Sequence, residues 1–406
     1  MKTHTPLSSI AEIQQLMLAA AQTVSAEQTI KLEHAVGRVL AAAQIADMDV
    51  PPYDNSAMDG YAVRHEDVQA TNRLQLTQRI PAGSNGSRLL PGTTARIFTG
   101  APIPPDCDAV VMQEEVDVAG EQILLQKAVH IGQNIRRRGE DIAKGNEILP
   151  AGHCLAPQDL GLLASIGIAE VTVKRQLRVA VFFTGDELVM PGQSLAAGQI
   201  YNSNRFMLRG LLEKLGCQIA DLGNVPDQLD ATRATLRQAA AENDLVLTCG
   251  GVSVGEEDHV KAAVEAEGRL DAWKIAIKPG KPLAFGHIGK VPFIGLPGNP
   301  VSAFVTFLLF ARPFILRQQG QQQVSGTPCM ARANFNWLKP DKRQEYLRAR
   351  LSLGKDGQSV ATLFPQQGSG VLTSCSWASG LVEVAPGQII NQGDWVRYYP
   401  LTEMGC

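Results

Sequence analysis

The sequence lacks an excess of either charge, any paired cysteine motif and any long apolar run, and each shortage excludes a class of protein. Lysine and arginine number 37 against 40 acids, a net charge of −3, so neither a nucleic-acid surface nor an acidic tail is expected. The seven cysteines are scattered, without a C-x-x-C pair. Free thiols in a reducing cytoplasm fit this usage better than a disulfide framework or a zinc site.

No apolar run approaches the roughly 20 residues that span a membrane, so no membrane partner is expected. Glutamate and glutamines interrupt the N-terminal segment, which argues against a secretion signal. Ser9 and Glu12 have the spacing of a capping box, and apolar residues recur at helical spacing from Ile10 to Ala20. This segment is predicted to be an amphipathic helix.

The 406 residues fall into four compositional regions, as expected for a chain of about two to four domains. Residues 1–45 are predicted to be helical, and short strands with Gly and Pro at their turns follow to about residue 140. A helix-plus-strand pattern returns at 145–175 and is expected to pack with the N-terminal helix. The expected domains are a discontinuous N-terminal and linker domain at 1–50 and 141–176, an inserted β domain at 51–140, an α/β domain at 177–326 and a C-terminal β-barrel at 327–406.

The third region alternates apolar strands, such as RVAVFF and DLVLTCGG, with amphipathic helices. This alternation is typical of a parallel sheet covered by helices on both faces. The predicted fold class is therefore multidomain α/β plus all-β, with a central parallel-sheet domain. In such a sheet, ligands bind outside the carboxyl ends of the strands.

Glycines, acids and lysines concentrate in the loops that follow these strands. The loops are TGDEL at 184–188, PD at 226–227, GGVSVGEEDHVK at 250–261, KPGKP at 278–282 and LPGNPVS at 296–302. Each loop alone has an ordinary explanation as a tight turn, a helix start that favours acids, or a basic surface turn. Their concentration at one edge of the sheet favours a binding site.

The chemistry of these loops suits a magnesium–phosphate ligand. Backbone N–H groups of a glycine turn ahead of a helix cradle oxyanions, although no Walker G-K-[ST] follows here. Lys278 and Lys281, on a loop stiffened by prolines, suit a doubly charged anion. Proteins hold Mg²⁺ with one or two carboxylates together with phosphate oxygens. The predicted metal ligands are Glu187, Asp227 and Asp258.

Four motifs make the chain resemble the molybdopterin molybdenumtransferase family, relatives of the gephyrin E domain. They are PPYDNSAMDGYAV, IFTGAPIPPDCDAVVMQEE, GGVSVGEEDHVK, and KPGKP followed by GLPGNPVS. Their order and spacing agree with the family over nearly the whole chain. The resemblance implies a transferase that inserts molybdenum from molybdate into adenylylated molybdopterin and releases AMP, with Mg²⁺ as the divalent metal.

The resemblance also implies site residues, carried over position by position. The catalytic set is Asp59, Thr99, Asp141 and Glu187. The ligand-binding set, which includes the loop glycines and lysines above, is Gly250, Gly251, Ser253, Gly255, Lys274, Lys278, Lys281, Pro297, Pro300, Arg350 and Ser369. Phe183 stands where family members often have a small residue, which affects only the fine shape of the pocket.

The family further implies a homodimer, with the site between the α/β domain of one subunit and the strand domain of the other. The loop at 50–63 would then carry Asp59 into the partner's pocket. A transient contact with the molybdopterin adenylyltransferase and other cofactor-biosynthesis proteins is implied as well. Two other functions stay open: that adenylyltransferase itself, whose fold resembles residues 177–325 alone, and a scaffold like the gephyrin relative.

Overall fold

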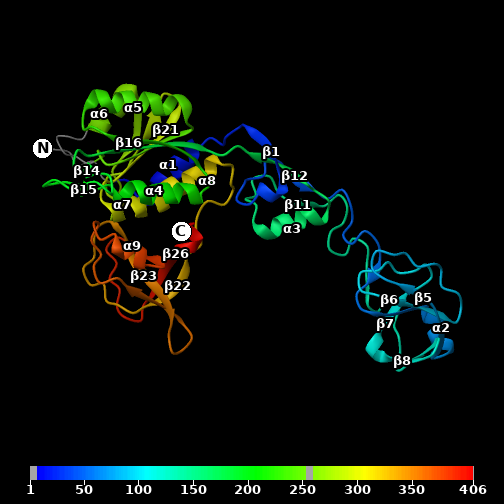
Figure 1. Cartoon of the computed structure of the whole chain (residues 1–406). Coiled ribbons are helices and arrows are strands. Elements are labelled where there is room, and N and C mark those ends of the chain that lie inside the picture. The colour runs from blue at the N-terminus through cyan, green and yellow to red at the C-terminus, as the bar shows by residue number, and fades with distance from the viewer. Residues whose placement is uncertain (1–6, 253–258, 406) are drawn as a thin grey trace.

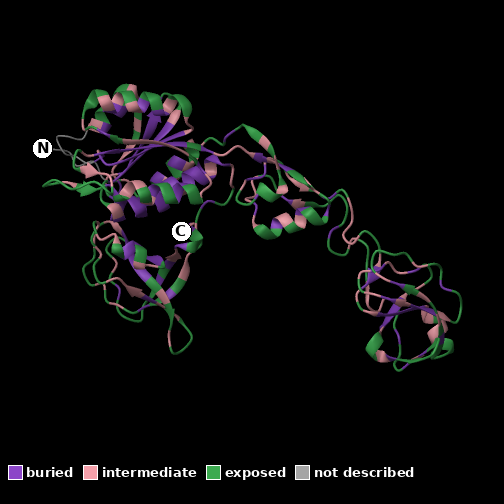
Figure 2. Cartoon of the chain, in the orientation of Figure 1, coloured by how far each residue is buried: buried purple, intermediate pink, exposed green. Residues whose placement is uncertain are grey.

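The computed structural model describes residues 7–252 and 259–405 and is elongated (Figure 1). A helix-covered sheet and a small barrel lie together at one end, and a separate body of strands lies at the other. A connector that contains β1 (Glu27–Lys31), β12 (Glu170–Lys174) and α3 (Pro157–Ser165) lies between them. Buried residues are densest in the helix-covered sheet (Figure 2), so that body contains the main core.

The N-terminal helix is shorter than predicted. α1 (Ile10–Ala20) has the predicted capping box, in which the backbone N–H of Ser9 donates to Glu12 at 2.7 Å and that of Glu12 donates to the Ser9 hydroxyl at 3.3 Å. After Ala20 the chain forms β1, a 3₁₀ turn (η1, Leu32–His34) and β2 (Gln44–Ile45). The prediction of helix to residue 45 is wrong, because EQTIK is paired as a strand.

The connector is built from two distant parts of the sequence. β1 pairs antiparallel with β12, and β2 pairs antiparallel with β11 (Glu147–Leu149). α1 does not join them: Ile10, Ile13 and Met17 are buried in the core of the α/β body. The expectation that this helix packs with 145–175 is therefore wrong, because its apolar face finds a larger apolar surface beside the sheet.

The strand body holds residues that are continuous in sequence. Its sheet has the order β7-β4-β6-β5-β9-β8, with β4 (Gly60–Val63) between β6 (Thr93–Ile97) and β7 (Ala109–Met112). The remaining elements are β3 (Asn55–Ser56), which pairs with β10 (Ile135–Arg136), β5 (Arg73–Ile80), β8 (Val116–Ala119), β9 (Gln122–Leu125), α2 (His65–Ala70) and η2 (Gln113–Glu115). The chain enters and leaves the body side by side, which supports the proposed insertion; the domain boundaries stay a prediction.

The α/β sheet has the order β16-β13-β17-β21-β20-β18. Four strands are parallel, as predicted: β13 (Arg178–Thr184), β16 (Gln218–Val225), β17 (Leu245–Cys249) and β21 (Val291–Leu296). β20 (Ala284–Ile288) was not predicted and runs antiparallel to β21, across a turn at Gly289 with φ +57°. β18 (Gly268–Trp273) is antiparallel to β20, so its carboxyl end lies at the same edge as that of β21.

Helices cover both faces of the sheet, as predicted. α5 (Leu229–Glu242) and α6 (His259–Glu267) lie on one face, and α1, α4 (Ser203–Lys214), α7 (Pro300–Thr306) and α8 (Arg312–Gln318) lie on the other (Figure 1). The side chains of β13 alternate between the two cores, with Phe182 toward α5 and Phe183 toward α4. Successive strand side chains point to opposite faces, so a strand apolar throughout suits a sheet covered twice.

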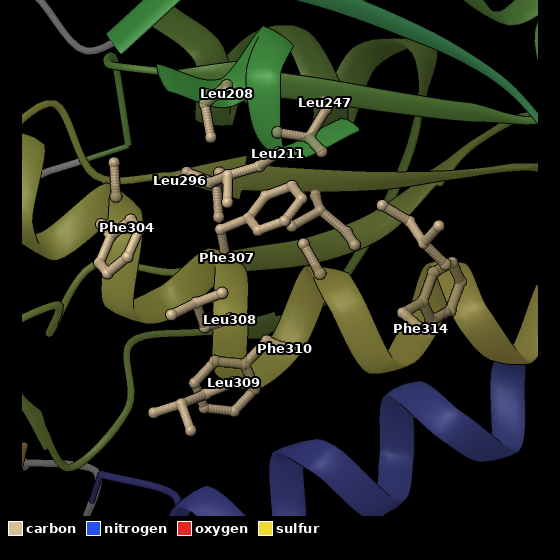
Figure 3. Packing of buried hydrophobic residues seen from close by; sticks show 14 of the residues in the cluster. Leu208, Leu211, Leu247, Leu296, Phe304, Phe307, Leu308, Leu309, Phe310 and Phe314 are labelled. Carbon is tan, nitrogen blue, oxygen red and sulfur yellow. The ribbon is translucent and has the colours of Figure 1, made fainter. Parts of the chain in front are cut away.

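The helical segment Pro300–Gln318 is long and apolar enough to span a membrane by length and composition. It is instead a core helix, because 83% of its most apolar window is buried in the protein. Figure 3 shows Phe307, Leu308, Phe310 and Phe314 of this segment packed against the sheet and its neighbours. Its middle is a π-helical turn (η3, Phe307–Ala311), one residue before Pro313.

The C-terminal region is a small β-barrel, as predicted. Its strands are β22 (Cys329–Ala333), β23 (Gln344–Leu353), β24 (Ser359–Leu363), β25 (Gly380–Val384) and β26 (Trp395–Pro400), and the pairing of β23 with β25 closes it. The short helices α9 (Thr373–Trp377) and η4 (Thr402–Met404) complete this region. β19 (Ile277–Lys278) leaves the α/β body and pairs with β23, which joins the barrel to the KPGKP loop.

Candidate active site

A cavity of about 540 Å³ lies at the carboxyl edge of the α/β sheet, where the sequence predicts a binding site. Residues that follow β13, β16, β17 and β21 line it, together with the start of α4 and the short strands β14 (Leu188–Val189) and β15 (Ile200–Tyr201). The predicted site residues in its lining are Glu187, Asp227, Gly250, Gly251, Pro297 and Pro300. The cavity is large enough for a ligand of cofactor size.

The glycine turn after β17 leaves no room for side chains. Gly250 and Gly251 have φ of +100° and +62°, a region that favours glycine. A Cβ at Gly251 would stand 2.5 Å from a methyl of Val260 and 2.7 Å from the hydroxyl of Thr184. The turn therefore exposes its backbone along the cavity wall. This is the arrangement predicted for holding an oxyanion.

Three carboxylates meet at the mouth of the cavity. The N–H of Asp186 donates to Asp227 at 3.3 Å, and the N–H of Asp227 donates to Asp186 at 3.2 Å. Burial raises the pKa of Asp227, and the charges of Asp186 and Glu187 raise it further, while the Asp186 N–H and His259 act in the opposite direction. This accumulated negative charge favours a cation at this place.

Two of the three predicted metal ligands fit a magnesium ion. Glu187 and Asp227 line the same cavity, and their charges interact. Asp258 lies outside the described residues. Within 7–252 and 259–405, no group of three or more His, Cys, Asp or Glu side chains is placed to hold a metal. A carboxylate pair is nevertheless the usual protein share of a magnesium site that also uses phosphate oxygens.

The structure adds polar residues to the site that the sequence did not single out. Asn204, in the first turn of α4, donates to the carbonyl of Gly298 at 2.6 Å and to the sulfur of Cys249 at 3.2 Å. Among residues 7–252 and 259–405, its side-chain oxygen has no hydrogen-bond partner, and neither has the hydroxyl of Thr184, which is only 5% exposed. Buried polar atoms are normally paired, so these two are ready to bind a ligand.

Sequence offered one signal for these residues. Asn202, two positions before Asn204, caps α4 by accepting the N–H of Arg205 at 3.1 Å. The stretch NSN follows a strand and opens a helix at the ligand edge, as the predicted loops do. The capping pattern accounts for Asn202 but gives no indication of the role of Asn204.

The start of α7 is held by the barrel. Pro300 is its first residue, and Asn299 occupies the cap position without a side-chain cap bond. The N–H of Val301 instead donates to the carbonyl of Ser369 at 3.0 Å. Ser369 is therefore next to the cavity through its backbone, at the junction of the barrel with the α/β body.

The loop that carries Ser369 is fixed by a fully buried arginine. Arg348 donates to the carbonyl of Gly368 at 3.2 Å and to the hydroxyl of Ser374 at 3.1 Å. No carboxylate accepts a hydrogen bond from Arg348 in the hydrogen bonds of the described residues, and burial lowers the pKa of its guanidinium. The guanidinium N–H groups of Arg348 therefore hold the loop in place beside α7.

The predicted lysines and Arg350 lie apart from the cavity lining. The ammonium of Lys278 is 2.7 Å from the buried carboxylate of Glu345 and 3.5 Å from Asp341, both in the barrel region. Lys274 has φ +74°, and Lys281 is exposed. Arg350 donates to the carbonyl of Trp377 and stacks over its ring at 4.6 Å. Their ligand roles stay predictions.

Asp59 is an ionised, fixed acceptor in the strand body. The N–H and the hydroxyl of Thr99 both donate to one oxygen of Asp59, each at 2.8 Å. These two bonds, backbone first, lower the pKa of Asp59, and the charge of Arg96 lowers it further. The structure therefore brings together two predicted catalytic residues, while Asp141 is exposed in the chain that leaves this body.

Within one chain, Asp59 does not reach the cavity. Asp59 directly precedes β4, whose partner strands β6 and β7 lie at the opposite end of the molecule from β16 and α7 (Figure 1). The predicted residues thus form two groups, one around Asp59 and one around the glycine turn. Ser253 and Gly255, like Asp258, lie outside the described residues.

Three family models match the chain in order. The MoeA N-terminal region (domain I and II) matches residues 8–167, a probable molybdopterin binding domain matches 180–317, and the MoeA C-terminal region (domain IV) matches 330–401. The second of these contains the cavity. The chain is thus a multidomain protein built around a probable molybdopterin-binding domain.

Similar proteins extend this class to a family. The chain is 46% identical over 343 residues to the molybdopterin molybdenumtransferase of Haemophilus influenzae, covering 84% of this chain and 85% of that protein. It is 34% identical over 365 residues to the molybdopterin molybdenumtransferase of a Nostoc species, covering 86% and 84%. The crystal structure of molybdopterin biosynthesis moeA protein from Pyrococcus horikoshii OT3 matches with a TM-score of 0.83 at 30% identity, covering 97% and 100%. The chain belongs to the molybdopterin molybdenumtransferase family.

Proposed function

We propose that this protein is a molybdopterin molybdenumtransferase, which inserts molybdenum from molybdate into adenylylated molybdopterin and releases AMP to form molybdenum cofactor. The observation that carries this proposal is the cavity at the carboxyl edge of the sheet. It combines a bare glycine turn, unpaired polar atoms and accumulated carboxylates inside the segment matched as a molybdopterin-binding domain. Family membership supports the same reaction.

The groups around the glycine turn bind the substrate. Backbone along Gly250 and Gly251 holds phosphate oxygens. The amide oxygen of Asn204 accepts from a polar group of the pterin or the nucleotide, and the Thr184 hydroxyl accepts or donates there. Pro297 and Pro300, from the neighbouring loop after β21, also line the cavity. These contacts fix the reacting part of the substrate relative to the carboxylates, which is worth a large share of any rate enhancement.

Glu187 and Asp227 would hold Mg²⁺ at this edge of the sheet. The bound ion would supply Lewis-acid chemistry that neutralises phosphate charge. The raised pKa of Asp227 supports this assignment, since a cation relieves the repulsion that raises it. Without the ion, Asp227 and its acidic neighbours repel an anionic substrate.

The functional unit is a homodimer in which Asp59 of one copy completes the pocket of the other. Two observations support it: Asp59 is held as an ionised acceptor by Thr99, and it lies far from the cavity of its own chain. A carboxylate held in a fixed position can bind a substrate or transfer protons. General acid–base catalysis of this kind typically raises a reaction rate by about 10²–10⁴-fold. Asp59 orients molybdate or relays the thiol protons of the dithiolene to the molybdate oxygen, which leaves as water when the two sulfurs bind molybdenum.

The protein acts in the cytoplasm and meets the adenylyltransferase that supplies its substrate. Cys107, Cys154, Cys217, Cys249 and Cys329 are free thiols, as expected in a reducing compartment. The transfer contact is a proposal that follows from the chemistry, because an activated pterin is short-lived in water. The regions on either side of the α/β domain match the MoeA N-terminal and C-terminal family models. These matches distinguish the chain from an adenylyltransferase.

The direct test offers the purified protein two sets of substrates. With adenylylated molybdopterin, molybdate and Mg²⁺, it should release AMP and yield a cofactor that reconstitutes an apo-molybdoenzyme. With ATP and molybdopterin, it should form no pyrophosphate. Pyrophosphate formation in the second reaction would identify an adenylyltransferase, and failure of both would favour a scaffold.

A further inference from the structure

We propose that a second cavity, at the amino edge of the same sheet, binds a small oxyanion ligand that also carries an O–H or N–H donor. The cavity has a volume of about 470 Å³ and lies where β17 and β21 begin, on the opposite side of the sheet from the candidate active site. It is lined by the β20–β21 turn, the end of α8, and the two chain segments that lead to the connector. This inference stands independently of the proposed function.

The charge of the lining favours an anion. Arg175, Arg269 and Lys290 line the cavity, against the single carboxylate of Asp244. Arg175 is occupied by Asp244 through two bonds of 2.8 and 2.9 Å. Lys290 has no ion pair or hydrogen bond among the described residues. It lies exposed in the β20–β21 turn, where its side chain can reach a bound anion.

Arg269 supplies the second available cation. It donates to Asp271 at 2.8 Å, but 65% of its side chain is exposed, so most of its donors are free for a ligand. A guanidinium held by one carboxylate and facing a cavity is suited to oxyanions, because its remaining N–H groups lie in a fixed fork. Lys290 and Arg269 therefore form the anion-binding side of this cavity.

Two further lining residues call for a donor on the ligand. His287 points one ring nitrogen, Nδ1, at Asp271 over 2.7 Å, which leaves Nε2 as the nitrogen available in the cavity. Gln318 is only 4% exposed, yet its side-chain oxygen has no hydrogen-bond partner in the part of the chain that the structure describes. A buried amide oxygen without a partner is unusual, and a hydroxyl or amine of a ligand would satisfy it.

The cavity lies at the joint between the α/β body and the connector. Residues 22–25 lead to β1 and Arg175 leads back from β12, and both chain segments line the cavity. The N–H of Val24 donates to the carbonyl of Gln318 at 2.8 Å, and that of Arg175 donates to Ala26 at 2.9 Å. A ligand held here ties both segments to the sheet and so limits how the connector swings.

Isothermal titration of the whole protein with phosphate and with sulfate at pH 7.5 tests the ligand chemistry. The two ions are similar in shape, and at this pH both are mainly dianions, but only hydrogen phosphate carries an O–H donor. We expect phosphate to bind at least about tenfold more tightly than sulfate. AMP forms a third arm: tighter binding than phosphate at this cavity identifies an organic phosphate as the ligand, and weaker binding identifies the free ion.

Hydrogen–deuterium exchange locates the bound ion. Protection of residues 22–25 and 287–292 is expected, separate from any protection at 184–188 and 297–302 in the candidate active site. The variant Lys290→Ala with Arg269→Gln should lose the first protection and about tenfold or more in phosphate affinity. Lys355→Ala, which removes an equally exposed lysine in a barrel turn, is the matched control and should bind like the parent.

Three results would overturn the inference: equal affinity for sulfate and phosphate, protection confined to the candidate active site, or unchanged phosphate binding in the double variant. If the double variant does not fold, Lys290→Ala alone decides, since Lys290 is exposed in a turn. It should lower phosphate affinity severalfold, whereas an unchanged affinity would count against the site.

Discussion

At the scale of the residue, the site depends on positions where a side chain cannot be tolerated. Gly251 is the sharpest case, since both its φ of +62° and the closeness of Thr184 and Val260 exclude a Cβ. Thr184 is also the residue with the unpaired hydroxyl. One atom added at Gly251 would therefore act on the fold and on the ligand-binding wall together.

The first prediction concerns Gly251→Ala, with Gly120→Ala as its control. Gly120 has nearly the same φ, +63°, but no atom lies within 4 Å of an added Cβ. Gly120→Ala should cost roughly 1–2 kcal/mol from backbone strain alone. Gly251→Ala should cost roughly 1–3 kcal/mol more from overpacking and should abolish AMP release. Urea unfolding and the AMP assay measure both; equal losses in the two variants would refute the tight turn.

The second prediction concerns Asp227, whose pKa is raised above its ordinary value of 3.8. Above the raised pKa the carboxylate is charged in both states and burial penalises the folded one; below 3.8 it is neutral in both, and the penalty vanishes. Asp227→Asn should therefore raise the melting temperature at pH 7.5, and this gain should shrink as pH falls toward 4. Mg²⁺ should stabilise the parent more than the variant.

Asp230→Asn is the control for this measurement. Asp230 lies three residues on, with 95% of its side chain exposed, so its replacement should not change stability in this pH-dependent way. Asp227→Asn should also lower the rate of AMP release. A variant less stable than the parent at pH 7.5, by an amount that does not change with pH, would contradict the raised pKa.

The sequence predicts the site residues in loops that follow strands. It does not predict the polar residues whose role depends on contacts in three dimensions. Gly250, Glu187 and Asp227 were predicted because the carboxyl edge of a parallel sheet collects loop residues, and all three line the cavity. Thr184 and Asn204 gain their interest from unpaired atoms, which only coordinates reveal. Lys278 was predicted to face an anion, but it is paired with Glu345, because β19 joins a barrel strand that no local pattern indicates.

At the scale of the element, α1 is held on the α/β body by a helix defect. Pro313 lacks an N–H, so the carbonyl of Leu309, four residues earlier, loses its helical donor. The side chain of Gln14 donates to this carbonyl at 2.8 Å. The amphipathic pattern predicted the helix, but not its neighbour, because the bond joins residues 295 apart in sequence.

The third prediction follows from this bond. Gln14→Leu should leave the Leu309 carbonyl without a partner and lower the free energy of unfolding by roughly 1–3 kcal/mol. Gln15→Leu, an exposed neighbour on the same helix, should change it by less than about 0.5 kcal/mol. Urea unfolding of the two variants gives the comparison, and equal stability would show that the bond contributes little.

The fourth prediction separates two roles of Lys278. Lys278→Met should leave the carboxylate of Glu345, which is 1% exposed, without its cation. Among the side-chain donors of the described residues, it would then retain the Trp337 indole at 2.9 Å. The cost should be at least roughly 1–3 kcal/mol. Adding Glu345→Gln should restore most of the stability. If Lys278 also binds the substrate anion, the double variant should keep a KM at least about tenfold raised; full activity would make Lys278 purely structural.

At this scale, local sequence patterns failed to predict the hairpin of β20 and β21. Its first strand, AFGHI, is short and apolar, and the two-residue turn Gly289-Lys290 separates it from a strand that was predicted. Short apolar runs of this kind do not reveal strand direction. The barrel and the helix-covered sheet were predictable because their patterns repeat over several strands.

At the scale of the whole molecule, the strand body is the least self-sufficient part. It contains its own sheet and buried clusters, yet two of the residues predicted for catalysis, Asp59 and Thr99, are bonded to each other here, away from the cavity of their own chain. The ion pairs Arg137–Asp54 and Arg138–Asp49, each at 2.6 Å, fix the joint where this body meets the connector. A fixed joint suits a body that presents Asp59 to a second copy.

The fifth prediction, and the most direct test of the shared site, uses two inactive chains. Asp59→Asn and Asp227→Asn are co-expressed with different tags, and the mixed dimer is isolated through both tags. If each pocket takes Asp59 from one copy and Asp227 from the other, the mixed dimer holds one intact site and should release AMP at about half the parent rate. Activity no higher than the mean of the two inactive dimers would place both residues in a single chain's site and contradict the account.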